Sequence, residues 1–200
     1  MARKKGQTED LRVQRTRKFL MQAMIDLIVE KGFLGITVQD ISDRAMVNRA
    51  TFYRHYRDKY DLLEQYINEV YKLTASGDES SPAQTNDKDP SNPPVGMVRM
   101  NEHVQTHADF YRVMLGTKGD PSFVQKMQQY TEMRLREAYG TRLKSESLPS
   151  DLCLSYLSYA GIGALVWWLN NGKQYTPKQI AGWILQLNEG VLSKAGVAKA

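Results

Sequence analysis

Residues 46–63 (MVNRATFYRHYRDKYDLL) combine four aromatic rings with five basic side chains in eighteen positions. An arginine such as Arg49 can donate two hydrogen bonds to the edge of a guanine, and the methyl groups of Ala50 and Thr51 suit contact with a thymine. The hydroxyl of Tyr53 suits a hydrogen bond to a phosphate oxygen. The combination of these groups indicates a surface that contacts nucleic acid.

The same stretch carries further candidate phosphate ligands and an apolar side. The imidazole of His55 can donate to a phosphate oxygen, and Lys59 stands at the start of the following helix, where backbone amides and an ammonium together favour an anion. Phe52 and Tyr56 are four positions apart, so they share one face of a helix. We expect these two rings to point inward while the polar side chains face a partner.

Two short helices must hold these side chains in place. Thr37 followed by Asp40 forms a capping box, which predicts a helix over residues 38–45. Asn48 is a good N-cap for a second short helix over residues 49–55. Two short helices joined by a tight turn have the outline of a helix-turn-helix, whose second helix enters the major groove of DNA.

Positive charge is concentrated in the first third of the chain. The formal net charge of all 200 residues is +5, but residues 1–60 alone contain thirteen Lys and Arg against seven Asp and Glu. A basic first third on a nearly neutral body predicts a polyanionic partner, and a solubilising tail is the alternative. Some of these cations stand at the start of a helix, where a phosphate partner or a solvated helix end would explain them: Arg12, Arg15, Arg17 and Lys18.

The rest of the sequence also predicts helices. Apolar residues recur with helical spacing before Gly32, after Asp58 and in several segments beyond residue 94, and no stretch alternates as a strand would. We therefore expect an all-α fold, with an N-terminal three-helix helix-turn-helix DNA-binding domain and a C-terminal helical domain. The expected units are a DNA-binding domain over 12–58, a connecting helix over 59–74, a mobile polar loop over 75–94 and the C-terminal domain over 95–197.

The segment ITVQDISDRAMVNRATFYRHYRDKYDLL resembles the DNA-binding signature of the TetR/AcrR (tetracycline-repressor) family of transcriptional regulators, and the resemblance covers about residues 14–72. The positions that match the signature are Thr37, Ile41, Ala45, Val47, Arg49, Thr51, Phe52, Tyr53, His55, Tyr56, Asp58, Lys59 and Leu62. The resemblance implies phosphate contacts by Thr37, Tyr53, His55 and Lys59. It implies base contacts by Gln39, Arg49, Ala50 and Thr51.

The segment departs from the family signature at three positions. Met46 stands where the family usually has a turn glycine, so a left-handed backbone there would cost about 1 kcal/mol or more. Asn48 replaces the usual serine but also caps a helix, and Ser42 replaces the usual alanine. These departures bear on the geometry of the turn.

The C-terminal part resembles the family less closely. Its segment WWLNNGKQYTPKQIA is similar to a subgroup that includes regulators of dihydroxyacetone kinase-like systems. Family members pair through their last two long helices and usually bind a small molecule in this domain, so we expect a homodimer and a small-molecule effector. The expected dimer interface is Leu157, Gly161, Leu165, Ile180, Ile184, Leu187 and Val191, and the expected ligand pocket is Tyr111, Met114, Phe123, Met127, Tyr130, Trp167 and Trp168.

One expected helix, over residues 152–169, has no charged residue. Such a helix is either buried on most sides, as in a dimer, or spans a membrane, because eighteen uncharged residues reach the lower limit for a span. Its serines, tyrosines and glycines and the lack of a flanking basic cluster favour burial, so we expect no membrane partner. A single cysteine, Cys153, excludes an internal disulfide framework and favours a reducing compartment, so we expect a cytoplasmic protein.

Enzymatic function has little support in the sequence. His103 and His107 are four positions apart, a spacing that can hold a metal, but no further His or Cys lies close to them. There is no Gly-rich phosphate loop and no nucleophile elbow, so we expect no enzyme, no metal and no cofactor. The sequence predicts a dimeric repressor that binds a near-palindromic operator on double-stranded DNA and is released by an effector. The alternative is a helical interaction protein or a nucleoid-type DNA-binding protein without an effector.

Overall fold

The computed structural model describes residues 3–75, 92–140, 143, 148–171 and 174–194, and within these ranges it contains helices and no strand. The all-α class is confirmed. The helices are α1 (Arg3–Lys31), α2 (Val38–Arg44), α3 (Arg49–Tyr53), α4 (Lys59–Ala75), α5 (Val95–Thr106), α6 (Ala108–Met114), α7 (Pro121–Tyr139), α8 (Ser150–Asn171) and α9 (Pro177–Lys194). The predicted mobile loop over 75–94 lies almost wholly outside the described residues.

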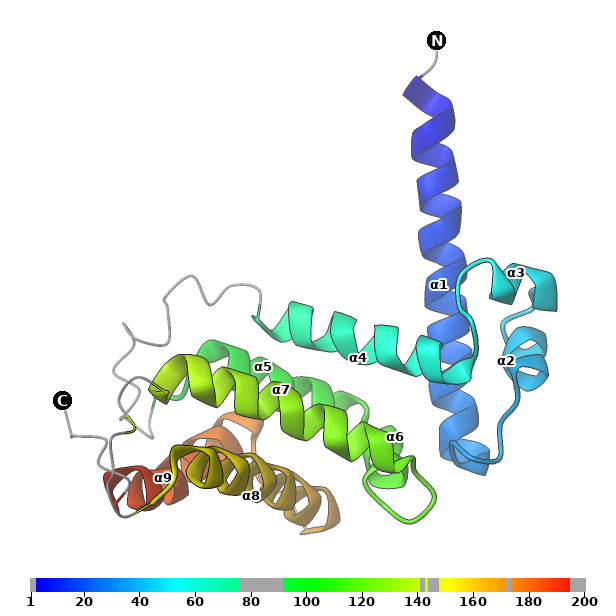
Figure 1. The fold of residues 1–200 in the computed structure, drawn as a ribbon. Coiled ribbons are helices and arrows are strands. Elements are labelled where there is room, and N and C mark those ends of the chain that lie inside the picture. The colour runs from blue at the N-terminus through cyan, green and yellow to red at the C-terminus, as the bar shows by residue number, and fades with distance from the viewer. Residues whose placement is uncertain (1–2, 76–91, 141–142, 144–147, 172–173, 195–200) are drawn as a thin grey trace.

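The N-terminal part is organised around α1, which stands as a long rod with α2 and α3 on one side (Figure 1). The second half of this helix is amphipathic, and its apolar positions are buried at the centre of the core, for example Leu20, Met24 and Ile28. The helix ends where Gly32 adopts a left-handed backbone with φ of 77°, as a C-terminal glycine commonly does. Helix α4 begins after the helix-turn-helix and crosses α1 (Figure 1).

The C-terminal part consists of α5 to α9, stacked beneath α4 (Figure 1). Helix α7 packs on α8, and α9 packs on both α5 and α8. By length and composition α8 would suffice to cross a membrane. In this fold one side of it is buried against neighbouring helices, through residues such as Leu154, Leu157 and Trp168. That burial is the behaviour of a core helix.

The two parts share one continuous apolar core, and a backbone contact also joins them. The amide of Phe33, after α1, donates to the carbonyl of Lys118 in the loop between α6 and α7, at 3.2 Å. A Cβ added to Gly32 would lie 3.0 Å from that same carbonyl oxygen. The loop of the C-terminal part is therefore in close backbone contact with the turn that precedes α2.

Candidate nucleic-acid interface

The two short helices form as their caps predict. The hydroxyl oxygen of Thr37 accepts from the amide of Asp40, whose carboxylate accepts from the amide of Thr37, and this capping box starts α2. The side chain of Asn48 accepts from the amide of Ala50 at 2.8 Å and starts α3. The helices end one and two residues earlier than predicted, at Arg44 and Tyr53.

The turn between α2 and α3 contains the unfavourable backbone conformation that we expected at Met46. Met46 has φ of 54°, the one positive φ of a non-glycine residue among those described. Its side chain is 91% exposed, so burial does not offset this cost. The turn is held by hydrogen bonds from the amide of Met46 to Asp43 and from the amide of Val47 to Ser42, each 3.0 Å. Met46 therefore adopts the positive φ that glycine adopts more readily, at a cost in stability.

Helix α3 has an apolar back and a polar front. Phe52 is fully buried and Tyr56 is almost fully buried, as predicted. Arg49, Ala50 and Tyr53 are exposed. The short helix therefore anchors itself in the core through one side and presents the other to a partner.

On this exposed front, Arg49 and Tyr53 support one another. A guanidinium nitrogen of Arg49 donates to the hydroxyl oxygen of Tyr53 at 3.1 Å, and the guanidinium carbon lies 5.4 Å from the centre of the tyrosine ring. A cation at this distance from a ring is attracted to it. The contact limits the freedom of Arg49 before any partner arrives, which lowers the entropy lost when the side chain is ordered in a complex.

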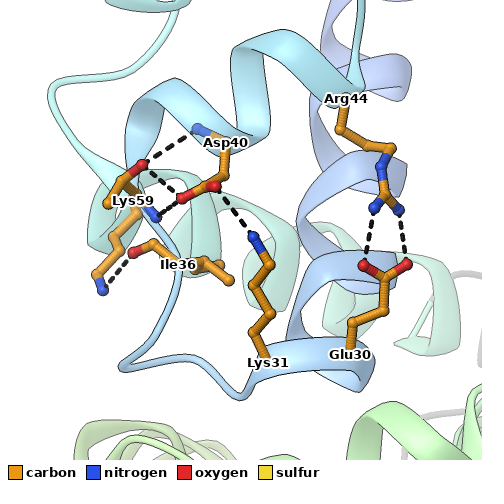
Figure 2. Close-up of polar contacts among 7 residues, drawn as sticks. Glu30, Lys31, Ile36, Asp40, Arg44 and Lys59 are labelled. Carbon is orange, nitrogen blue, oxygen red and sulfur yellow. Dashed lines mark hydrogen bonds and ion pairs between the residues drawn. The ribbon is translucent and has the colours of Figure 1, made fainter.

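Ion pairs fasten α2 to α1 (Figure 2). The guanidinium of Arg44 donates two hydrogen bonds to the carboxylate of Glu30, at 2.9 and 2.7 Å. The ammonium of Lys31 lies 3.1 Å from a carboxylate oxygen of Asp40. Hydrogen bonds from the side chain and backbone of Thr37, followed by the one from Lys31, lower the pKa of Asp40 to about 2. These contacts hold the first helix of the motif in a fixed orientation on α1.

Lys59 is directed toward the protein backbone. Its ammonium donates to the carbonyl oxygens of Phe33, Leu34 and Ile36, at 3.0, 3.4 and 2.9 Å, and Figure 2 shows the last of these bonds. An ammonium has three hydrogens to donate, and all three are engaged here. Burial lowers the pKa of Lys59. In this structure Lys59 holds the turn between α1 and α2, and a phosphate contact by Lys59 would require its ammonium to exchange partners.

The other expected DNA-binding residues differ in their exposure. Thr37, Gln39, Arg49, Ala50 and Tyr53 are exposed, whereas Thr51 and His55 are half-buried. The amide of Gln39 donates to Asp43 at 2.7 Å, so a base contact would require it to exchange partners. Two exposed cations next to α3, Arg54 and Arg57, were not among the predicted DNA-binding residues. Both could have been predicted to be exposed, because each lies within two positions of Phe52 or Tyr56, whose side chains face inward.

A cavity of about 430 Å³ lies in the C-terminal part, bounded by α4, α5, α7, α8 and α9. Methionines and two stacked tyrosines, Tyr71 and Tyr130 with ring centres 4.1 Å apart, form much of its wall. Of the seven residues expected to line a pocket, Met127 and Tyr130 do so. The other five do not: Tyr111, Met114, Phe123 and Trp168 are packed in the core, and Trp167 is 47% exposed on the surface. Helical periodicity placed those side chains inside the protein without distinguishing a core from a cavity wall.

The outward face of α8 and α9 carries large apolar side chains, and it differs from the expected dimer interface. Four expected residues, Leu157, Leu165, Ile180 and Ile184, are buried inside the chain's own core, and Gly161 lines the cavity. Leu187 is 73% exposed, and Val191 is half-buried. The exposed apolar face comprises Leu152, Tyr156, Tyr159, Trp167, Trp183 and Leu187.

Comparison with known proteins agrees with this architecture. Residues 91–190 match the family described as transcriptional regulator C-terminal region, and residues 20–66 match the family described as bacterial regulatory proteins, tetR family. The chain belongs to the TetR family of transcriptional regulators. As a member of this family it is a DNA-binding transcription factor with a helix-turn-helix, and not an enzyme.

Individual relatives of this TetR-family regulator match it over part or most of its length. The uncharacterized HTH-type transcriptional regulator YxbF of Bacillus subtilis is 44% identical over 66 residues, which cover 32% of this chain and 17% of YxbF. A TetR transcriptional regulator from Streptococcus agalactiae has a similar solved structure, with a TM-score of 0.66 and 24% identity over 92% of this chain and 98% of that one. The dihydroxyacetone kinase operon activator DhaS has a TM-score of 0.59 and 17% identity over 89% and 96% of the two chains.

Proposed function

We propose that this TetR-family regulator is a cytoplasmic, dimeric repressor that binds a near-palindromic operator and leaves it when a small molecule enters the C-terminal cavity. The observation that carries this proposal is the two-sided α3, whose buried Phe52 anchors a front formed by Arg49, Ala50 and Tyr53. Such a short helix can present its polar side to a major groove while its apolar side stays packed in the core.

The DNA-binding domain, over about residues 12–58, contacts bases through α3 and phosphates through residues around it. Arg49 donates to a guanine, and the methyl groups of Ala50 and Thr51 contact a thymine. Gln39 reaches a base edge from α2, and Thr37, Tyr53 and His55 donate to phosphate oxygens. Lys59 contributes indirectly. Its hydrogen bonds hold the turn before α2, and this turn fixes the position of Thr37.

Two copies pair through the outward face of α8 and α9. The exposed side chains of this face, including Tyr156, Trp167 and Leu187, form an apolar surface that a second copy would remove from water. A two-fold dimer presents two α3 helices to two half-sites, which is why the operator should be nearly palindromic. The connecting helix over 59–74 links this C-terminal domain, over 95–197, to the DNA-binding domain.

The effector we expect is a mainly apolar, neutral molecule small enough for a cavity of about 430 Å³. Methionine walls adapt to ligands of different shape. Hydrogen-bonding groups at the wall include Asn68, which accepts from the hydroxyl of Tyr130, and Asn101. Helix α4 connects this cavity to the DNA-binding domain, because Asn68 and Tyr71 line the cavity near one end while Lys59, at the other end, holds the turn before α2. An effector that shifts α4 would therefore change the placement of α2 and α3.

The test is selection of bound fragments from the source genome, followed by release from the selected fragment with a panel of metabolites. Release requires that the effector bind the non-binding form more tightly, since equal affinity for both forms shifts nothing. A Gly161→Leu variant should lose the response, because Gly161 lines the cavity. Gln125→Leu, on the exposed side of α7 and outside the cavity lining, is the control for adding a leucine side chain elsewhere. Sequence-selective binding without any response to the panel would favour a DNA-binding protein that has no effector.

A further inference from the structure

Two buried hydrogen-bonding atoms beside the helix-turn-helix have no partner. They are Nε of Arg17, on α1, and the hydroxyl oxygen of Tyr56, just after α3, and they are the unpartnered buried side-chain atoms in the described part of the chain. Tyr56 as a whole is 2% exposed, whereas Arg17 is half-buried. Buried donors of this kind are rare and call for an explanation, such as a group that is missing from the free protein.

The same place also gathers positive charge. The ring centre of His55 lies 6.3 Å from that of Tyr56, and Arg54 directly precedes His55 in the chain. Burial, then the charge of Arg17 and then that of Arg54, lower the pKa of His55. Neither arginine forms an ion pair with any residue that the structure describes. Asp61 and Glu69 of α4 also face this region, since both act on Tyr56, but Asp61 already accepts from Arg57 and Gln65. Arg54 donates one hydrogen bond, to the hydroxyl of Thr51 at 3.4 Å. Two arginines without an ion-pair partner near one imidazole favour an anion.

The position of the cluster identifies the anion. Arg54 is the C-cap of α3, and His55 follows it, so the cluster lies between the end of the proposed recognition helix and α1. When a helix occupies the major groove, the phosphates that flank the groove lie beside that helix and the elements next to it. A phosphodiester oxygen would accept hydrogen bonds from the guanidinium groups and offset their repulsion.

We propose that Arg17 is a DNA-binding residue that, together with Arg54 and His55, holds one phosphate of the operator backbone. This inference rests on the proposed placement of α3 in the major groove and extends the interface to α1. It also gives a role to part of the basic cluster at residues 12–18. Arg17 is set apart from its neighbours in that cluster by its half-buried side chain and its unpaired Nε.

The experiment uses the full chain and a fluorescent 24-base-pair duplex of arbitrary sequence, with affinity measured by anisotropy over a range of KCl concentrations. Arg17→Gln should weaken binding on the order of tenfold at ~0.1 M KCl and reduce the slope of log K against log [KCl] by about 0.9 per protomer. Arg17→Lys should keep most of the slope, because the charge remains. Lys178→Gln, on the exposed start of α9, removes the same charge far from the site and should change neither quantity.

A second measurement tests the site in the free protein. Arg17→Gln should raise the pKa of His55, observed by NMR of its ring proton, because one of the charges that lower it is gone. Duplex DNA should raise it in the wild type. Equal slopes for Arg17→Gln and Lys178→Gln would overturn the inference while leaving the placement of α3 intact. Binding of inorganic phosphate at His55 with no change in DNA affinity would also overturn it. A wild type that binds no duplex would overturn both proposals.

Discussion

The ammonium nitrogen of Lys59 lies 3.0 Å from the carbonyl oxygen of Phe33, to which it donates a hydrogen bond across twenty-six positions of the sequence. The amide of the same Phe33 donates to the carbonyl of Lys118 in the C-terminal part. One residue of the turn before α2 is thus bonded both to the start of α4 and to the loop between α6 and α7. This turn is the place where a movement of the C-terminal part would reach the DNA-binding helices.

Replacement of Lys59 by methionine should lower the free energy of unfolding by about 1–3 kcal/mol, because carbonyls of the turn lose a charged donor. DNA binding should weaken as well, but the dependence of affinity on salt should keep its slope if the ammonium of Lys59 stays bonded to its three carbonyls. Urea unfolding and anisotropy titrations measure both effects. Lys178→Met is the control for loss of one charge. A slope that falls by about 0.9 in Lys59→Met would show a direct phosphate contact instead.

Met46→Gly should raise the free energy of unfolding by about 1 kcal/mol, because glycine adopts a positive φ without the clash that a Cβ creates. Little packing is lost, since the Met46 side chain is 91% exposed. Leu73→Gly is the control: Leu73 is 67% exposed and lies inside α4, where glycine should destabilise by about 1 kcal/mol. Equal loss of stability in both variants, measured by denaturant unfolding, would rule out backbone strain at Met46.

Leu187→Glu should convert the proposed dimer into a monomer, because a carboxylate would have to be buried in the proposed interface of α8 and α9 without a partner. Dimer affinity should fall by at least about a hundredfold, which sedimentation equilibrium detects as a change in mass. Leu73→Glu on α4 is the control, since Leu73 is similarly exposed, at 67% against 73%, but lies outside that face. A dimer that survives Leu187→Glu would place the interface elsewhere.

Stability should fall on mild acidification because of His103. Its Nε2 lies 3.0 Å from the hydroxyl oxygen of Tyr66, and burial, followed by the charge of His107, lowers its pKa to about 4. The unfolded chain takes up this proton near pH 6.5. The stability contribution of the neutral ring is therefore complete above that pH and is lost as the pH falls toward 4.

Between pH 7 and 5 we expect a loss of about 1 kcal/mol from this group, after allowing for the part of the ring that solvent reaches. Thermal unfolding of His103→Gln should show a smaller loss over the same range. Asp40 has a pKa of about 2, so its contribution to stability changes only in more acidic solution. An unchanged pH dependence in the variant would contradict this assignment.

The local features of this fold depend on residues that are close to one another in the sequence. The capping box at Thr37 and the cap at Asn48 could be predicted because each depends on residues within three positions. The direction of Lys59 could not be predicted, since its carbonyl partners come from a turn more than twenty positions away. Helix α8 is apolar nearly all round, so its sequence alone could not show that Leu157 faces inward while Tyr156 faces outward.

We propose that α3 contacts base edges in a major groove. A substitution of Arg49 tests this contact most directly. Competition of the wild type and Arg49→Ala against single-base variants of the selected operator measures the contribution of each base pair to binding. We predict that Arg49→Ala loses about 1–3 kcal/mol of discrimination at one base pair in each half-site and keeps it at the others. Identical base preferences for the two proteins at every position would contradict the proposed role of α3.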